Sequence, residues 1–378
     1  MSDTYTLYGS YASYYTAKVR AYLRKKNVPF VERLPSDPMF RNKVRPTSGS
    51  HRIPQLMTPD GQVLQDSVTI VDYLEERFPE LPAFPETPKQ RTFVHLMELL
   101  GSEGLVRLAW MHRWMFGENF RFVKMDFGRS FAPQGSDEDL QKYGDLIADR
   151  MMSYGLPEST EELRASLDET YIQLLKLFEA HLTEHPYFLG GQPTAADYAV
   201  MGAMHAHMGR DPAGLRVMQD HGPRTFRWME HMIVPEVQSP EVYHVPVALA
   251  ANDEVPDTAL AILRFIADQF GPPFLLDALA FPLAIEQQGL GQGDQVSSEQ
   301  DQPSLQAVTV EYSGETYEHG ARVYPEWLGQ RARRFFQAQE QGVQDSILRC
   351  LDHKTLADLL TAPVSKIVER VNNRFVIS

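Results

Sequence analysis

The alternation of apolar and polar positions divides the chain into a short N-terminal stretch of mixed elements and a longer helical remainder. Thr4–Tyr8 and Phe30–Leu34 have the composition of short strands, and Thr16–Lys26 between them has apolar residues at helical spacing. Two strands joined through a helix are parallel, so the chain is predicted to open with a βαβ unit.

A second unit follows a loop that is rich in proline, serine and glycine, residues 35–50. Gln55–Met57 and Gln62–Leu64 flank Pro59-Asp60-Gly61, and an Asp-Gly pair between apolar segments is typical of a β-hairpin. Apolar residues from Ser67 to Phe78 then predict a helix. The predicted order is therefore βαβ followed by ββα.

Beyond a proline-rich linker at residues 81–88, the spacing of apolar residues becomes helical. Thr194-Ala-Ala-Asp197 is a variant of the capping box that begins a helix. Further helices are predicted at residues 163–182, 222–231, 257–269 and 273–287. Residues 286–306 contain seven glutamines and predict a flexible loop, residues 307–323 predict a hairpin around Ser313-Gly314, and the remainder is expected to be helical. We therefore expect an α/β domain at residues 1–82, an all-helical domain at 88–240 and a mostly helical extension with a β-hairpin at 246–378.

The composition argues against several classes of protein. Lys and Arg number 36 against 50 Asp and Glu, so the net charge of −14 disfavours nucleic acid as a partner. No apolar run reaches the length of about 18 residues that a membrane helix needs, and the N-terminus has no signal-peptide pattern. The single cysteine, Cys350, excludes internal disulfides and cysteine-based zinc sites. We expect a soluble, cytoplasmic protein that binds no membrane.

Three motifs of the N-terminal stretch carry a resemblance to a known family. They are Tyr8-Gly-Ser-Tyr-Ala-Ser13 with the following helix to Arg20, then Arg52-Ile53-Pro54-Gln55, and then Leu64-Gln-Asp66-Ser67. With the βαβ–ββα order and the later capping box, this set resembles the glutathione transferase superfamily over roughly residues 4–235. The resemblance implies a thioredoxin-like first domain, an all-α second domain, glutathione as co-substrate, no metal, and a homodimer.

The resemblance also assigns a catalytic residue. Ser13 falls where the serine-type classes carry the serine that donates a hydrogen bond to the glutathione sulfur. A free thiol has a pKa of about 8.5, and a helix N-terminus favours the thiolate. Three alternatives stay open: Ser13 as an N-cap alone, Ser10 as the donor, or a phenol from the tyrosines beside it, Tyr8, Tyr11, Tyr14 and Tyr15.

The glutathione-binding residues follow from the same resemblance. Pro54 in the cis form lets the Ile53 backbone pair with the cysteinyl part of glutathione. Asp66 accepts from the γ-glutamyl ammonium, and Ser67 binds the γ-glutamyl carboxylate at a helix N-terminus. Arg52 or His51 meets the glycyl carboxylate. Each of these residues also has a purely structural interpretation. Pro54 would be a proline at the start of a strand, Asp66-Ser67 a helix cap, and Arg52 a solvated surface charge.

The electrophile is expected to bind between the tyrosines and the first helices of the second domain. Trp110, His112 and Trp114 belong to an aromatic and methionine cluster of the kind that suits hydrophobic ligands, although such clusters are usually core. With them we place Tyr11 and Tyr14. His205 and His207 are two positions apart, a spacing that points helical side chains away from each other, so we expect no metal there.

Two functions remain in competition. The first is conjugation of the glutathione thiolate to a hydrophobic electrophile, with glutathione-dependent isomerisation, ether cleavage or dehalogenation as variants on the same fold. The second is a non-catalytic scaffold or ligand-binding protein that acts through its C-terminal extension. Tyr11 stands where proline is common in the serine-type classes, and Tyr15 stands where other classes carry a catalytic cysteine, which excludes cysteine-type thiol transfer.

Overall fold

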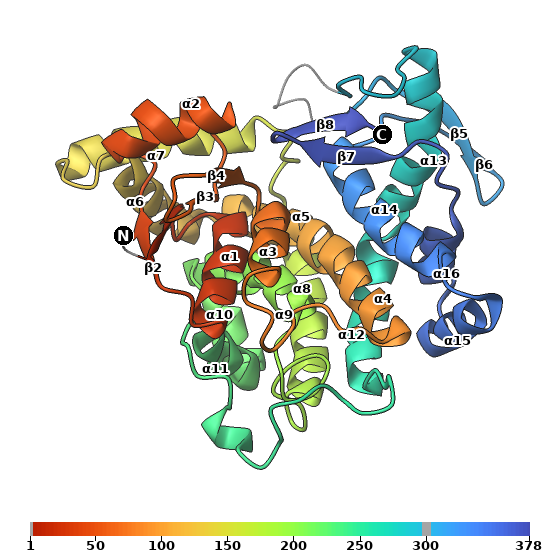
Figure 1. Ribbon diagram of the computed structural model, residues 1–378. Helices are drawn as coiled ribbons and strands as arrows, with labels where there is room; N and C mark the ends of the chain where they lie inside the picture. Colours follow the sequence, from red (N-terminus) through yellow and green to blue (C-terminus); the bar gives the residue numbers. More distant parts are fainter. Residues whose placement is uncertain (1–2, 297–303) are drawn as a thin grey trace. The chain divides into compact units, whose positions relative to one another are not determined.

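The computed structural model describes residues 3–296 and 304–378, which form two compact units (Figure 1). The first unit contains the chain up to Ala83 and Leu105–Leu249, and the second contains Phe84–Gly104 and Ala250–Ser378. Residues 84–104 therefore belong to the same compact unit as the C-terminal extension. Each unit is described by itself.

The first unit begins with a four-stranded mixed sheet in the order β2-β1-β3-β4. Strands β1 and β2 are parallel, and β3 is antiparallel to both β1 and β4. The elements are β1 (Tyr5–Tyr8), α1 (Tyr14–Lys25), β2 (Phe30–Arg33), α2 (Arg45–Ser48), β3 (Gln55–Met57), β4 (Val63–Gln65) and α3 (Ser67–Glu75). The βαβ–ββα order and the thioredoxin-like class are confirmed. The loop predicted at residues 35–50 instead contains a π-helical turn, η1 (Phe40–Val44), followed by α2.

The sheet and its helices share an apolar core. Leu7 of β1 and Leu56 of β3 are completely buried, as are Val19 and Leu23 of α1 and Leu74 of α3. The 3.6-residue spacing of the apolar positions in α1 and α3 directs these side chains to one face of each helix. Burial of this face fixes where α1 begins, and therefore where its N-terminal residue lies.

The helical part of the first unit contains α5 (Leu105–Met115), α6 (Phe120–Phe131), α7 (Asp137–Met152), α8 (Glu161–His181), α9 (Ala195–Met201), the π-helix η4 (Gly202–Met208), α10 (Pro212–His221) and α11 (Pro223–Met232). The predicted capping box begins α9. The Asp197 carboxylate accepts from the Thr194 backbone N–H at 2.8 Å and from the Phe188 N–H at 2.9 Å. Burial raises the pKa of Asp197 to about 7.

Helices α6 and α7 form a closely packed hairpin. A Cβ atom on Gly128 would lie 2.1 Å from the carbonyl oxygen of Leu140, and one on Gly144 would lie 2.2 Å from that of Lys124. Only glycine allows two backbones to approach this closely. Helix α6 of this hairpin carries Asp126, which pairs with Arg210.

The second unit is mostly helical, as predicted for the extension. It contains α4 (Pro88–Met97), the π-helix η2 (Glu98–Gly104), α12 (Asp257–Phe270), α13 (Pro272–Gln287), α14 (Val323–Gln337), α15 (Gln341–Leu351) and α16 (Lys354–Thr361). The predicted hairpin is confirmed as β5 (Val308–Tyr312) and β6 (Glu315–His319). It is held to α13 by the buried carboxylate of Asp277, which accepts from His319 and from the Arg322 guanidinium.

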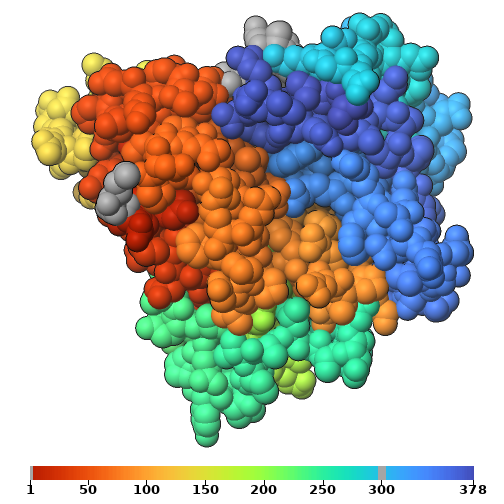
Figure 2. Space-filling model, viewed as in Figure 1, coloured from red at the N-terminus to blue at the C-terminus, as the bar shows by residue number. Residues whose placement is uncertain are grey.

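The chain ends in a second hairpin that the sequence analysis assigned to helix. Strands β7 (Val368–Val371) and β8 (Arg374–Ile377) pair around Asn372 and Asn373, both of which have positive φ. Asparagine tolerates this conformation, and two such residues make the tight turn that a hairpin needs. The dark blue residues of this hairpin lie on the surface of the unit in Figure 2. Part of the predicted glutamine-rich loop, residues 297–303, lies outside the described residues.

Among the described residues, no single helix combines the length and apolar character of a membrane span; α12 and α13 meet the criterion only as a pair that is bent by 64°. Within residues 3–296 and 304–378, no group of three or more His, Cys, Asp or Glu side chains is arranged to hold a metal ion.

Candidate functional site

The three sequence motifs meet at one edge of the sheet. Tyr8 at the end of β1 is level with Gln55 at the start of β3, and Gln55 is level with Gln65 at the end of β4. The residues that extend these strands therefore lie side by side. They are Gly9 and the loop to Ser13, Ile53-Pro54, and Asp66-Ser67; the Asp66 N–H donates to the Pro54 carbonyl at 3.3 Å. Residues 9–13 are called the Ser13 loop below.

Ser13 is the N-cap of α1 and is half-buried. Its Oγ accepts from the Thr16 backbone N–H at 3.3 Å and from the Thr16 hydroxyl at 2.9 Å. A hydroxyl has two acceptor positions and one proton. Both acceptor positions are used by Thr16, so the Ser13 proton remains available to donate to another acceptor. N-cap and hydrogen-bond donor are therefore compatible roles for this residue.

The fit of the Ser13 loop to α1 depends on a glycine. A Cβ atom on Gly9 would lie 2.2 Å from Cγ2 of Thr16 and 2.8 Å from its hydroxyl oxygen. Gly9 thus allows Thr16 to reach back under the loop and to bond Ser13. Through these hydrogen bonds Thr16 holds the Ser13 loop against α1 and orients the Ser13 side chain.

Asp66 and Ser67 begin α3 and keep polar atoms available. Asp66 has φ 92°, a left-handed conformation that is uncommon outside glycine and is found most often at functional sites. Its Oδ1 accepts from the N–H groups of Val68 and Thr69, at 3.0 and 3.1 Å, which leaves Oδ2 for a ligand. Oγ of Ser67 is buried and has no hydrogen-bond partner among the described residues. An ammonium and a carboxylate would satisfy these two groups.

The segment before β3 is held in place by hydrogen bonds from a buried side chain, that of Gln55. The Ile53–Pro54 peptide is cis, as the resemblance implied. The fully buried Gln55 donates through Nε2 to the carbonyls of Ser50 and Arg52, at 2.8 and 2.9 Å. The side chain of Arg52 is exposed and that of Ile53 is half-buried. Gln55 is a positioning residue that the sequence analysis quoted but gave no role.

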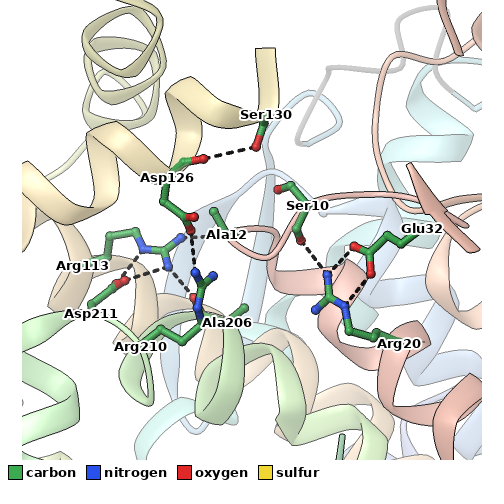
Figure 3. Close-up of polar contacts among 10 residues, drawn as sticks. All are labelled: Ser10, Ala12, Arg20, Glu32, Arg113, Asp126, Ser130, Ala206, Arg210 and Asp211. Atoms are coloured by element: carbon green, nitrogen blue, oxygen red, sulfur yellow. Dashed lines mark hydrogen bonds and ion pairs between the residues drawn. The ribbon is translucent and has the colours of Figure 1, made fainter. Parts of the chain in front are cut away.

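A second positioning residue comes from a distant part of the chain. Arg113 of α5 donates through Nη1 to the Ala12 carbonyl at 2.9 Å and through Nη2 to the Ala206 carbonyl at 2.5 Å. Its charge is balanced by the buried Asp211, at 2.7 Å from Nε. Figure 3 shows this arginine joining the Ser13 loop to η4 and to the start of α10. The sequence offered no signal for it, because Ala12 and Arg113 are about a hundred positions apart.

Arg20 holds the other side of the Ser13 loop. Its Nη2 donates to the Ser10 carbonyl at 3.1 Å and to Glu32 of β2 at 2.6 Å (Figure 3). The guanidinium carbon lies 3.9 Å from the ring centroid of Tyr11, whose side chain is 47% exposed. Ser10 itself is buried, so its carbonyl serves the loop while its side chain has little access to a ligand.

The predicted aromatic residues fall into two groups. Tyr11 and Trp110 keep exposed surface. Tyr8 and Tyr14 are buried: Tyr8 packs on Phe40 with its pKa raised by burial, and Tyr14 packs edge-on against His207. Trp114 lies in an apolar cluster with Val123 and Ala148.

His112 is also a core residue. Its Nε2 lies 2.9 Å from the Asp168 carboxylate, and its ring stacks on Phe116. Of the five residues predicted to bind the electrophile, the structure therefore buries Tyr14, His112 and Trp114 in helix packing. Helical spacing alone did not distinguish this core face from a ligand surface.

Comparison with known proteins decides the family. Residues 7–82 match the model of the glutathione S-transferase N-terminal domain, and residues 145–234 match the model of its C-terminal domain. The chain belongs to the glutathione transferase superfamily. The expected enzyme class and glutathione as co-substrate agree with this membership of the superfamily. Residues 83–144 and 235–378 lie outside both matches.

Individual relatives of this superfamily member are distant. A curated protein described as a probable maleylacetoacetate isomerase from Caenorhabditis elegans is 26% identical over 203 residues, which are 53% of this chain and 92% of that protein. A glutathione S-transferase of Ceriporiopsis subvermispora, solved with glutathione, is 17% identical with a TM-score of 0.43; the match covers 61% of this chain and 99% of the other. The beta-etherase LigF of Sphingobium sp. is 21% identical with a TM-score of 0.42, and the match covers 62% and 96%.

Proposed function

We propose that the protein is a glutathione transferase that joins the glutathione thiolate to an electrophilic carbon. The observation that carries the proposal is the Ser13 hydroxyl at the N-terminus of α1, whose acceptor positions are filled by Thr16 and whose proton remains available to donate. Oγ of Ser67 and Oδ2 of Asp66, on the same sheet edge, supply the partners for the γ-glutamyl end of the tripeptide.

The mechanism assigned to these residues is simple. Asp66 and Ser67 bind the γ-glutamyl group, Ile53 pairs with the cysteinyl backbone, and Arg52 or His51 meets the glycyl carboxylate. The thiol loses its proton, and the sulfur accepts a hydrogen bond from Ser13 near the positive end of the helix dipole. The thiolate then forms the new carbon–sulfur bond while the leaving group departs from that carbon with its bonding pair, and the thiol proton goes to solvent. Proximity together with stabilisation of the thiolate charge supplies the rate. A cytoplasmic homodimer and a hydrophobic electrophile are part of the proposal.

A second candidate is glutathione-dependent isomerisation. The curated relative described as a probable maleylacetoacetate isomerase supports it. Isomerisation uses the same thiolate, which adds to the substrate and leaves again, so it makes the same demands on Ser13, Asp66 and Ser67. The two activities differ in product, and product analysis separates them.

Replacement of Ser13 tests the proposed chemistry. Ser13→Ala removes a charge-assisted hydrogen bond, so we expect kcat with 1-chloro-2,4-dinitrobenzene to fall about 10- to 100-fold. The affinity for S-hexylglutathione, measured by calorimetry, should stay within about twofold. Asp66→Ala combined with Ser67→Ala should abolish that affinity.

The matched control is Ser136→Ala. Ser136 is also an N-cap, and its Oγ accepts from the Asp139 N–H at 3.2 Å at the start of α7. Loss of either cap costs about 1 kcal/mol of stability. If Ser13→Ala and Ser136→Ala lower activity equally, Ser13 is only a cap. If the unaltered protein does not bind millimolar S-hexylglutathione, it is a non-catalytic scaffold.

A further inference from the structure

Three arginines surround the Ser13 loop, and they differ in how fully their N–H groups are used. Arg113 donates through all three of its nitrogens. Arg20 and Arg210 each retain one buried nitrogen, Nη1, that has no hydrogen-bond partner within the described residues. The side chain of Arg20 is 1% exposed, so this donor is shielded from bulk water. A buried N–H without a partner is costly, and two such donors beside one loop call for an explanation, which a bound ligand would supply.

Both of these arginines lie against the same aromatic ring. The guanidinium carbon of Arg20 is 3.9 Å from the centroid of Tyr11, and that of Arg210 is 5.4 Å from it. The ring of His205 is also near, with its centroid 6.1 Å from that of Tyr11, and its buried Nδ1 has no partner in the described part of the chain. In Figure 3, Arg20 and Arg210 lie on opposite sides of the segment that carries Ser10 and Ala12.

The Tyr11 ring, which lies near both guanidinium groups, is free to move. It is half-exposed, and exposed side chains change rotamer within nanoseconds. A guanidinium that lies over a ring keeps its in-plane N–H groups for another partner. In the arrangement inferred below, a ligand reaches the buried donors when the Tyr11 ring moves aside.

Hydrogen-bond donors that have no partner among the described residues, rather than net positive charge, favour a carboxylate as the ligand. Arg20 pairs with Glu32 at 2.6 Å and Arg210 pairs with Asp126 at 2.9 Å, so the attraction comes from unused donors and not from excess charge. His205 adds no positive charge, because burial and the two arginines lower its pKa to about 3. A planar carboxylate has two oxygens that match guanidinium N–H groups, and it can accept from both arginines at once.

Tyr11, which lies near both arginines, is close to Ser13, the residue proposed to bind the reacting sulfur. Tyr11 and Ser13 are two positions apart in the sequence, so their Cα atoms lie within about 7 Å of each other. Phe122 of α6 also lies against Arg210, with its ring centroid 5.5 Å from the guanidinium carbon. An aromatic body held beside Phe122 would place its carboxylate at the arginines and another substituent toward Ser13.

We propose that Arg20 and Arg210 form an anion subsite beneath Tyr11 that binds the carboxylate of an aromatic electrophile. This inference rests on the proposed function, since it names the class of second substrate. Arg20 also holds the Ser10 carbonyl, so Arg210 is the better residue to alter.

A pair of probes isolates the carboxylate. 4-(Chloromethyl)benzoate and its methyl ester react with glutathione in the same way. The thiolate forms a carbon–sulfur bond at the benzylic carbon, the carbon–chlorine bond breaks, and chloride leaves with the bonding pair, while the thiol proton goes to solvent. The two compounds differ only in the anionic group. Chloride release and chromatography of the thioether measure both reactions.

We expect Arg210→Gln to lower kcat/KM for the benzoate about tenfold or more and to leave the methyl ester within about twofold. The affinity for S-hexylglutathione should not change. Arg216→Gln is the matched control, because Arg216 also pairs with a carboxylate, Glu118 at 2.7 Å, but lies exposed on α10. Equal losses for benzoate and ester, or no loss for either, would overturn the proposal. A parallel loss of S-hexylglutathione affinity would also overturn it, because the arginine would then serve glutathione.

The same variants separate failure of the subsite from failure of the proposed function. If the unaltered protein turns over neither probe, 4-methylbenzoate, which cannot react, is titrated by calorimetry. Binding that is lost in Arg210→Gln and kept in Arg216→Gln supports the anion subsite even without turnover. Absent binding, or equal binding to both variants, overturns it.

Discussion

Ser13 accepts two hydrogen bonds from Thr16, and this pair shows how one residue sets the chemistry of its neighbour. When an oxygen accepts a hydrogen bond from another hydroxyl, its own proton becomes a better donor. Thr16 is completely buried and cannot reach a substrate. Its contribution to activity would therefore pass through Ser13.

Thr16→Val keeps the shape of the side chain and removes the hydroxyl. We expect kcat/KM with 1-chloro-2,4-dinitrobenzene to fall about three- to tenfold, the equivalent of one ordinary hydrogen bond. The pKa of the bound thiol should rise, because the thiolate loses part of its stabilisation. The pH profile of kcat/KM and the thiolate absorbance measure this shift.

Thr92→Val is the control for the loss of a buried hydroxyl. Thr92 is buried in α4, and its Oγ1 donates to the Pro88 carbonyl at 2.7 Å. This variant should leave the pH profile unchanged. A slower Thr16→Val enzyme with an unaltered pH profile would show that Thr16 is only structural.

The candidate site was predictable from sequence only where its residues are local. Ser13, Pro54 and Asp66 stand in motifs whose strand-to-helix context could be read directly, and the structure brings those motifs to one sheet edge. Arg113 and Arg210 were missed because their partners, Ala12 and Asp126, lie about 100 and about 80 positions away. No spacing rule predicts a contact over such a distance; only the packing of the helices creates it.

The same distinction holds for whole elements. Apart from η1 and α2, the order of strands and helices up to residue 75 followed from periodicity and one Asp-Gly turn, because these signals are local. Trp114 and His112 were placed on a ligand surface although they are core, because helical spacing marks an apolar face without showing what covers it. The β7–β8 hairpin was missed although Asn372-Asn373 carried a usable turn signal.

The α6–α7 hairpin depends on its two glycines. Gly144→Ala would place a methyl group 2.2 Å from the Lys124 carbonyl, and a backbone atom cannot move away as a flexible side chain can. We expect a loss of about 1–3 kcal/mol in the free energy of unfolding. Thermal denaturation measures it.

Gly342→Ala in α15 is the control, because nothing lies within 4 Å of the added methyl group. Alanine favours helix over glycine, so this variant should gain up to about 1 kcal/mol. Unchanged or higher stability of Gly144→Ala would mean that the two helices can separate without cost. The Asp126–Arg210 ion pair would then depend on a helix hairpin that deforms easily.

Proton binding affects the stability of the molecule as a whole, and His181 gives a defined contribution. Burial, aided by the nearby His185, lowers the pKa of His181 to about 3. In the unfolded chain it titrates near 6.5. The folded protein therefore keeps this group neutral while the unfolded chain takes up a proton. Its contribution is fully present above pH 6.5 and is lost as the pH falls toward 3.

His181→Gln should reduce the acid sensitivity of the free energy of unfolding between pH 6.5 and 4. One proton corresponds to about 1.4 kcal/mol per pH unit, which is the largest change expected in the slope. Urea denaturation at a series of pH values measures it. His244→Gln, at an exposed histidine, should leave the slope unchanged. Parallel curves for His181→Gln and the unaltered protein would contradict this account.

The second unit is built from two separated stretches, Phe84–Gly104 and Ala250–Ser378, and this has a consequence for biosynthesis. Its first piece leaves the ribosome early, with Phe93, Leu96, Leu99 and other apolar side chains that are buried only when the unit is complete. At about 5–20 residues per second, the C-terminal stretch is finished tens of seconds later. During that interval the nascent chain displays an unburied apolar helix between two segments that are already able to fold, which makes it a natural target for a chaperone.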